Sequence, residues 1–210
     1  MSKIQEIFQA VETGKSKAIE DLVKAALAEG VDPMSILSEG MIAAMGAVGD
    51  KFQKGDIFVP EMLVAAKTMK KGVDVLKPKL GSGAVGSRGK CIIGTADGDL
   101  HDIGKNLVTM MIESAGFEVI DLGVDVKADA FIDAIKKNPD VKIVGLSCLL
   151  TTVMPALKDT MQKIKGSGLS GFKLIIGGAP ITQEYANQLG ADGYAADAAG
   201  AAVLAKKLAS

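Results

Sequence analysis

Five short β-rich runs alternate with helical stretches in the second part of the sequence, and this alternation is what most constrains the fold. Each helical stretch connects one strand to the next, so the strands must run parallel with helices on both faces. The sequence therefore predicts an α/β domain, a five-stranded parallel sheet of the flavodoxin-like or Rossmann-like kind with strand order 2-1-3-4-5. The predicted strands are residues 91–96, 117–122, 141–147, 172–178 and 191–196, and the predicted helices lie near residues 104–115, 128–137, 153–165, 181–189 and 198–208.

Residues 1–78 have helical periodicity throughout. Apolar residues recur at the i, i+3, i+4 and i+7 spacing of one helix face in four successive segments. Gly30 ends the second segment, and Asp32 before Pro33 is typical of an N-cap followed by a first-turn proline. Four amphipathic helices with short connections predict a small helical bundle. The predicted helices cover residues near 4–11, 19–27, 33–55 and 60–78.

A glycine- and serine-rich segment, residues 79–89, separates the two patterns. Such a composition is typical of a flexible linker. The sequence therefore predicts a helical bundle over residues 1–78, a linker over residues 79–89, and an α/β domain over residues 90–210.

Composition excludes several classes of partner. The net charge is -1 and tryptophan is absent, so we expect no nucleic-acid partner. No apolar run is long enough to cross a bilayer, and the first residues lack the pattern of a signal peptide, so we expect a cytoplasmic protein without a membrane partner. The two cysteines, Cys91 and Cys148, lie in apolar runs without a Cys-x-x-Cys spacing, which predicts free, packed thiols.

The predicted strand order indicates where a ligand binds. In an open parallel sheet the binding crevice lies at the carboxyl ends of the strands, here beside the loops after strands 1, 3 and 4. The only histidine of the chain, His101, lies in the first of these loops, two residues after Asp99. A lone histidine is more often structural, but a metal-ligating imidazole commonly donates its second ring N–H to a carboxylate, and Asp99 can accept it.

The kind of metal site follows from the number of protein ligands. Zinc sites need three or four, which one histidine and two strand cysteines cannot supply. A single protein ligand suits a metal already held by a macrocycle, so the sequence predicts a tetrapyrrole-like cofactor. Phosphate binding is the competing interpretation of this loop, but neither a G-x-G-x-x-G nor a G-K-[ST] motif is present.

The ends of strands 3 and 4 carry small residues, Ser147 in the first case and Gly177 and Gly178 in the second. Taken alone, each is an ordinary turn residue. Their placement beside the His101 loop predicts a channel in which the backbone can approach a ligand closely.

Together these residues resemble a known family. Asp99-Leu100-His101-Asp102-Ile103-Gly104, then Ser147-Cys148-Leu149, then Gly177-Gly178, resemble the D-x-H-x-x-G, S-x-L and G-G signature of cobalamin-binding domains. Residues 52–62 resemble the cap helices of methionine synthase and of the corrinoid proteins of anaerobic methyltransferase systems. The similarity spans about residues 3–208 and is greatest to the methylamine, methanol and betaine type of corrinoid protein.

The resemblance implies cobalamin or a related corrinoid, bound base-off/His-on, with His101 as the metal ligand and Asp99 as its hydrogen-bonding partner. In methionine synthase a serine extends this His–Asp relay; Val153 stands at that position here, so the relay ends at Asp99 or reaches a water. Phe52 and Val59 would cover the methyl-bearing face, although plain bundle core explains them equally well. The other implied cofactor-binding residues are Gly98, Leu100, Asp102, Gly104, Ser147, Leu149, Thr151, Gly177, Gly178 and Ala198.

The function implied by the resemblance is that of a methyl carrier, cycling between cob(I)alamin and methylcob(III)alamin. Its partners would be a substrate-specific methyltransferase, a second methyltransferase that delivers the methyl group to tetrahydrofolate or a thiol, and a reductive activase. No base or nucleophile set is evident, so the chain is not expected to be an enzyme on its own. The alternatives are a cobalamin-binding sensor or storage module and the cobalamin subunit of a mutase; residues 1–78 argue against the mutase subunit, which lacks a capping bundle.

Overall fold

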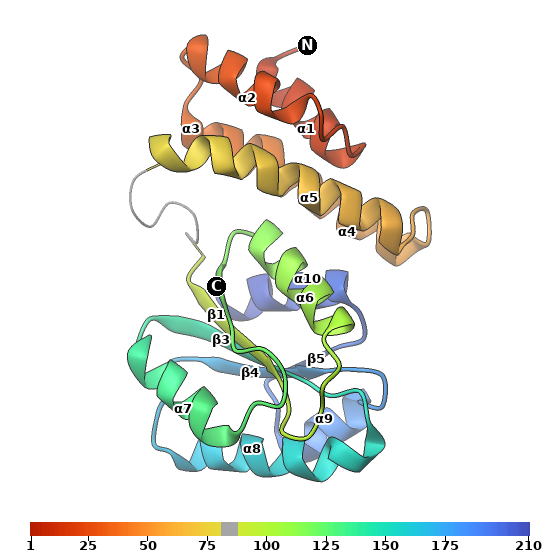
Figure 1. Ribbon diagram of the computed structural model, residues 1–210, viewed down its shortest axis with the longest axis vertical. Coiled ribbons are helices and arrows are strands. Elements are labelled where there is room, and N and C mark those ends of the chain that lie inside the picture. Colours follow the sequence, from red (N-terminus) through yellow and green to blue (C-terminus); the bar gives the residue numbers. More distant parts are fainter. Residues whose placement is uncertain (81–87) are drawn as a thin grey trace. The chain divides into compact units, whose positions relative to one another are not determined.

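The structure is a computed structural model that describes residues 1–80 and 88–210. The chain divides into two compact units, one holding the helices up to Lys79 and the other beginning at Arg88 (Figure 1). Most of the predicted linker, residues 81–87, lies outside the described residues.

The N-terminal unit is helical, as the apolar periodicity predicts. Ser2 caps the first helix with a capping box, and Asp32 accepts the backbone N–H of Ser35 at 2.9 Å with Pro33 in the first turn. The third predicted helix runs without a break through three segments, the middle one a π-helix. The helices are α1 (Lys3–Glu12), α2 (Ile19–Ala28), α3 (Pro33–Ser35), the π-helix η1 (Ile36–Ile42), α4 (Ala43–Lys54), α5 (Val59–Leu76) and the 3-10 turn η2 (Lys77–Lys79).

The core of this unit is formed by the repeating apolar positions of the four helices. A glycine at position 40 lets the π-helix approach α1 closely, since a Cβ there would lie 3.1 Å from Cγ2 of Ile7. The largest wholly buried side chains of the unit are Ile7, Ile19, Ile36, Met41, Met62 and Leu76.

The C-terminal unit is a five-stranded parallel sheet with strand order β2-β1-β3-β4-β5, which confirms the predicted topology. The helices α6 and α10 cover one face of the sheet, and α7, α8 and α9 cover the other (Figure 1). The strands are β1 (Lys90–Thr95), β2 (Glu118–Asp121), β3 (Val141–Ser147), β4 (Lys173–Gly177) and β5 (Gly193–Ala195), and the helices are α6 (Ile103–Ser114), α7 (Ala128–Lys137), η3 (Thr151–Val153), α8 (Met154–Gly166), α9 (Gln183–Leu189) and α10 (Ala198–Leu208).

The sheet core holds β1 tightly in place. Ile92, Val144 and Leu146 are buried together with Phe131 of α7. A Cβ on Gly94 would lie 2.7 Å from Cζ of Phe131, so only glycine lets this ring pack directly on the backbone of β1. The loop that follows β1 therefore starts from a fixed point.

The strand register brings the ends of four strands together. Thr95 of β1 is paired with Ser147 of β3, Ser147 with Gly177 of β4, and Gly177 with Ala195 of β5. Because these last residues are in register, the loops after β1, β3 and β4 emerge side by side at one edge of the sheet, as the predicted topology requires.

Candidate functional site

The loop after β1, residues 96–102, is anchored to its neighbours at its start. The Ala96 N–H donates to the Ser147 carbonyl at 2.9 Å, and Ala96 forms a parallel bridge with Val126. Gly98 has a φ of 84°, a conformation that costs a glycine little, and the Asp99 N–H donates back to the Ala96 carbonyl at 3.0 Å. The chain thus turns sharply and directs Asp99 into the protein.

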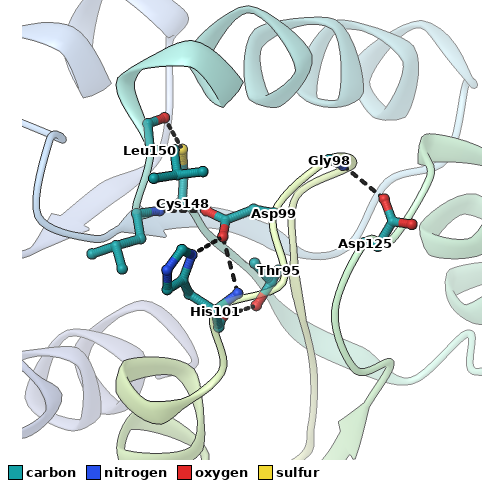
Figure 2. A network of polar contacts seen from close by, with 8 residues as sticks. Thr95, Gly98, Asp99, His101, Asp125, Cys148 and Leu150 are labelled. Carbon is teal, nitrogen blue, oxygen red and sulfur yellow. Dashed lines mark hydrogen bonds and ion pairs between the residues drawn. The ribbon is translucent and has the colours of Figure 1, made fainter.

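Asp99 is wholly buried and accepts hydrogen bonds from two loops (Figure 2). Its Oδ1 accepts the His101 backbone N–H at 3.0 Å and lies 2.7 Å from His101 Nδ1. Its Oδ2 accepts the Leu149 N–H, from the loop after β3, at 2.6 Å. A single carboxylate therefore joins the loop after β1 to the loop after β3 and fixes one nitrogen of the imidazole.

The charge state of Asp99 is set by these donors. Burial alone would raise its pKa, but the N–H groups of Leu149 and His101 and the imidazole of His101 stabilise the carboxylate, and the net effect lowers the pKa of Asp99. An ionised Asp99 accepts the proton on Nδ1 of His101, which leaves Nε2 as the nitrogen with a free lone pair. Nε2 has no hydrogen-bond partner in the described part of the chain.

The imidazole lies in an exposed apolar setting. The side chain of His101 is 52% exposed, and beside it in the sequence Leu100 is 72% and Ile103 78% exposed. Leu149 and Leu150, in the loop that reaches Asp99, are also exposed. Within residues 88–210 only Val203 is a further large exposed hydrophobic residue, so the apolar surface of this unit gathers around His101. A broad, largely apolar group carrying a metal with one open coordination position fits this surface.

The ends of β3 and β4 are in close backbone contact. Gly178 has a φ of 127°, and a Cβ there would lie 1.8 Å from the carbonyl oxygen of Cys148. A Cβ on Gly177 would lie 2.9 Å from the carbonyl oxygen of Ala195. The sequence predicts that these glycines admit a ligand, and the structure adds that the protein's own backbone requires both of them.

The remaining predicted residues vary in their surroundings. Asp102 is exposed and accepts the Asn106 side-chain amide at 3.1 Å, and a Cβ on Gly104 would meet no atom within 4 Å. Thr151 is exposed in η3, and Ala198 is buried at the start of α10.

Three further predicted residues concern the relay and the methyl-bearing face. Val153 is buried and supplies no hydroxyl to continue the relay. Phe52 is half-buried and Val59 is 37% exposed, both in the helical unit, and their role stays a prediction.

Sequence reasoning missed several residues that hold the loop. The hydroxyl of buried Thr95 donates to the His101 carbonyl at 3.0 Å, and Asp125 accepts the Gly98 N–H at 2.7 Å. Lys105, 2% exposed, pairs with Asp121 at the end of β2. Of these residues, only Lys105 could have been noticed in the sequence, because it directly follows the D-x-H-x-x-G motif.

The two cysteines are free and buried, as predicted. Burial raises the pKa of Cys91 to about 12. Burial, together with the negative charge of Asp99, raises the pKa of Cys148 to about 11. Neither thiol is therefore a ready metal ligand or nucleophile at neutral pH. Among the residues that the structure describes, no three His, Cys, Asp or Glu side chains gather to hold a metal ion, and no helix could span a membrane.

Comparisons with known proteins identify the family of the chain. A family model described as a B12 binding domain matches residues 89–203, and a second B12 binding domain model matches residues 3–77. Dimethylamine corrinoid protein 1 of Methanosarcina acetivorans is 42% identical over 98% of this chain and 96% of its own length.

Two solved structures are similar over nearly the whole chain. The methanol:cobalamin methyltransferase complex of Methanosarcina barkeri matches with a TM-score of 0.86 and 29% identity, over 99% of this chain and 79% of that one. A cobalamin-binding protein from Desulfitobacterium hafniense matches with a TM-score of 0.81 and 32% identity, over 98% of both chains. The chain therefore belongs to the B12-binding corrinoid proteins of the kind found in methylamine and methanol methyltransferase systems.

Proposed function

We propose that this chain carries a methyl group on the cobalt of a bound corrinoid, from a substrate-specific methyltransferase to a second methyltransferase that delivers it to tetrahydrofolate or a thiol. The observation that carries the proposal is the state of His101. Its Nδ1 is held 2.7 Å from a buried carboxylate, and its Nε2 has no hydrogen-bond partner among the described residues. The neighbouring residues Leu100 and Ile103 are exposed apolar side chains, as is Leu149 in the loop that reaches Asp99. The bound corrinoid would be base-off/His-on, and it would supply the metal that accepts and releases the methyl group.

In this proposal His101 is the lower ligand and Asp99 its positioning partner. Nε2 donates its lone pair to the metal, and the ionised carboxylate makes the imidazole a better donor by accepting the proton on Nδ1. The same carboxylate would stabilise a positive charge on the imidazole whenever Nε2 is not bound to the metal. Because Val153 offers no hydroxyl, the relay would end at Asp99 or reach a water, and the half-exposed imidazole lies open to solvent.

For the other predicted residues we propose the roles that the resemblance implies. Gly98, Leu100 and Asp102 of the loop after β1, and Gly104 in the first turn of α6, would meet the ring. Phe52 and Val59, from the helical unit, would cover the methyl-bearing face. The residues proposed along the nucleotide tail are Ser147, Leu149, Thr151, Gly177, Gly178 and Ala198.

The comparisons support a substrate class. One relative is a dimethylamine corrinoid protein, and one similar solved structure is a methanol:cobalamin methyltransferase complex. We infer that the first partner of this chain demethylates a small methylamine or methanol, that a reductive activase restores cob(I)alamin, and that all of them work in the cytoplasm. The chain itself would not turn over substrate without these partners.

The test is anaerobic reconstitution of the apo-protein with hydroxocobalamin. Wild-type protein should retain one corrinoid per chain through gel filtration, with the absorption spectrum of a His-on cofactor. After reduction of its cobalt to Co(I) with a chemical reductant such as Ti(III) citrate, it should be methylated by a methylamine- or methanol-specific methyltransferase. His101→Ala should lose the His-on spectrum and most of the transfer. Asp133→Ala, a change on the exposed surface of α7, is the matched control and should behave as wild type. Normal methyl transfer by His101→Ala would refute the proposal.

A further inference from the structure

The segment after β2 lies along the loop that carries His101. The Leu122 N–H donates to the Ile93 carbonyl at 2.8 Å, the Thr95 N–H donates to the Gly123 carbonyl at 3.0 Å, and the Val126 N–H donates to the Thr95 carbonyl at 2.9 Å. These backbone bonds fix the segment after β2 on the end of β1. None of these three bonds involves the side chain of Asp125, so replacing that side chain leaves all three in place.

Asp125 adds two bonds, one from its side chain and one from its main chain, and both are made to the turn before His101. Its Oδ1 accepts the Gly98 N–H at 2.7 Å, and its own N–H donates to the Asp99 carbonyl at 2.9 Å (Figure 2 shows the bond to Gly98). The side chain and the main chain of one residue thus hold the backbone of Gly98 and Asp99 from the neighbouring loop.

The backbone of Asp125 is strained. With a φ of 54° it is the one residue other than glycine, within residues 1–80 and 88–210, that has a positive φ. Aspartate tolerates the left-handed region better than most residues, but a glycine would adopt it at lower cost. The backbone conformation alone favours glycine at this position, so the presence of aspartate indicates that its carboxylate has a specific role.

The contacts that connect Asp125 to His101 indicate this role. Gly98 and Asp99 are consecutive, so holding their backbone fixes the point from which the Asp99 side chain extends. The Asp99 carboxylate in turn holds Nδ1 of His101 at 2.7 Å. A displacement of the Gly98–Asp99 backbone would therefore move the imidazole.

We propose that Asp125 is a positioning residue for His101, and that it sets how much of the bound corrinoid has the imidazole attached. This inference rests on the proposed function. Removing the carboxylate should free the turn at Gly98 and lower the ratio of His-on to His-off cofactor. A charge-assisted hydrogen bond of this kind corresponds to a roughly tenfold change in that ratio.

Two variants separate the carboxylate from the backbone. Asp125→Gly removes the acceptor, keeps the N–H that donates to Asp99, and relieves the strain at positive φ. The relieved strain offsets part of the stability lost with the hydrogen bond, so the apo-protein should still fold. Asp125→Asn keeps an oxygen that can accept the Gly98 N–H and also tolerates the left-handed region, but it lacks the charge.

The measurement uses protein labelled with ¹⁵N in histidine, reconstituted with unlabelled hydroxocobalamin and reduced to Co(II); the His-on fraction is read from the ¹⁵N doublet in its electron paramagnetic resonance spectrum, because the benzimidazole of the cofactor would give a triplet. The His-on to His-off ratio should decrease roughly tenfold in Asp125→Gly and roughly threefold in Asp125→Asn. If Asp125→Gly has the His-on to His-off ratio of wild type, the inference is overturned. This holds even if the thermal midpoint of Asp125→Gly is lower, because Asp125 would then contribute only to stability. If Asp125→Gly does not fold, a wild-type ratio in Asp125→Asn overturns it.

The labelled wild-type spectrum distinguishes failure of the proposed function from failure of this inference. If labelled wild type still shows a triplet, the proposed function fails, because the imidazole is not the ligand. If labelled wild type shows the doublet and both Asp125 variants match it, the proposed function stands and only the role of Asp125 fails.

Discussion

The two glycines Gly178 and Gly104 belong to the same cobalamin-binding signature, yet the structure predicts opposite outcomes when each is replaced by alanine. At Gly178 the φ of 127° is disfavoured for any residue with a Cβ, which costs about 1–3 kcal/mol. The new Cβ would also lie 1.8 Å from the Cys148 carbonyl oxygen. That oxygen cannot move alone, because the Leu149 N–H of the same planar peptide group is bonded to Asp99 Oδ2 at 2.6 Å.

Relieving such an overlap requires the ends of β3 and β4 to separate, at a cost of about 1–3 kcal/mol for overpacking. We therefore expect Gly178→Ala to lower the free energy of unfolding of the α/β unit by roughly 4 kcal/mol, a large part of the stability of a small domain. Gly104→Ala, in the first turn of α6 with no atom within 4 Å, should be neutral or stabilising by up to about 1 kcal/mol.

Urea unfolding followed by tyrosine fluorescence measures the stability of the α/β unit, where both glycines lie. The chain has two tyrosines and no tryptophan, and both tyrosines, Tyr185 and Tyr194, lie in the α/β unit. A wild-type midpoint for Gly178→Ala, or an equal loss for Gly104→Ala, would refute the steric reasoning. In addition, Gly104→Ala should weaken hydroxocobalamin binding without loss of stability, because its Cβ occupies space at the surface proposed for the cofactor.

Three further predictions concern buried charges and thiols. Because burial raises the pKa of Cys91 to about 12 and of Cys148 to about 11, iodoacetamide at pH 8 should modify neither thiol in the folded protein and both in urea; rapid labelling without denaturant would contradict the packing. Lys105→Met should cost roughly 2 kcal/mol, less than breaking a wholly buried pair, because its partner Asp121 is 33% exposed; an unchanged urea midpoint would show that the pair contributes nothing. Folding lowers the pKa of Asp99, so its carboxylate stabilises the protein above pH about 4, and that contribution is lost as the pH falls through the folded pKa. The difference in unfolding free energy between wild type and Asp99→Asn should therefore be largest at pH 7 and shrink in acid. A difference independent of pH would contradict this.

Most of the fold could be predicted because its elements obey simple periodicities. The limits of β3, α7 and α10 agree with the predicted ranges 141–147, 128–137 and 198–208, since each has a clear apolar pattern between polar or glycine boundaries. The π-helix η1 could not be predicted. Its apolar residues still recur at helical spacing, so the pattern does not reveal the extra residue in the π-helical turn. The one feature seen with it is the close packing of α1 against Gly40, which is visible only in the structure.

The site could be predicted as far as residue identity reaches. His101 and Asp99 are two residues apart, so their contact within one loop could be expected from the sequence. The bond from the Leu149 N–H to Asp99 depends on the register between β1 and β3, which no local pattern encodes. Asp125 was missed for a similar reason: a left-handed aspartate does not differ in sequence from any other loop aspartate, and its partner Gly98 lies 27 positions away.

The central claim is that Nε2 of His101 is the lower ligand of the corrinoid cobalt, and the chain allows a direct measurement because His101 is its only histidine. Protein labelled with ¹⁵N in histidine alone should be reconstituted with unlabelled hydroxocobalamin, reduced to Co(II), and studied by electron paramagnetic resonance. If Nε2 of His101 is the ligand, the nitrogen triplet seen with unlabelled protein becomes a doublet. A triplet that persists with labelled protein would show that the benzimidazole of the cofactor still binds the metal, and would contradict the account.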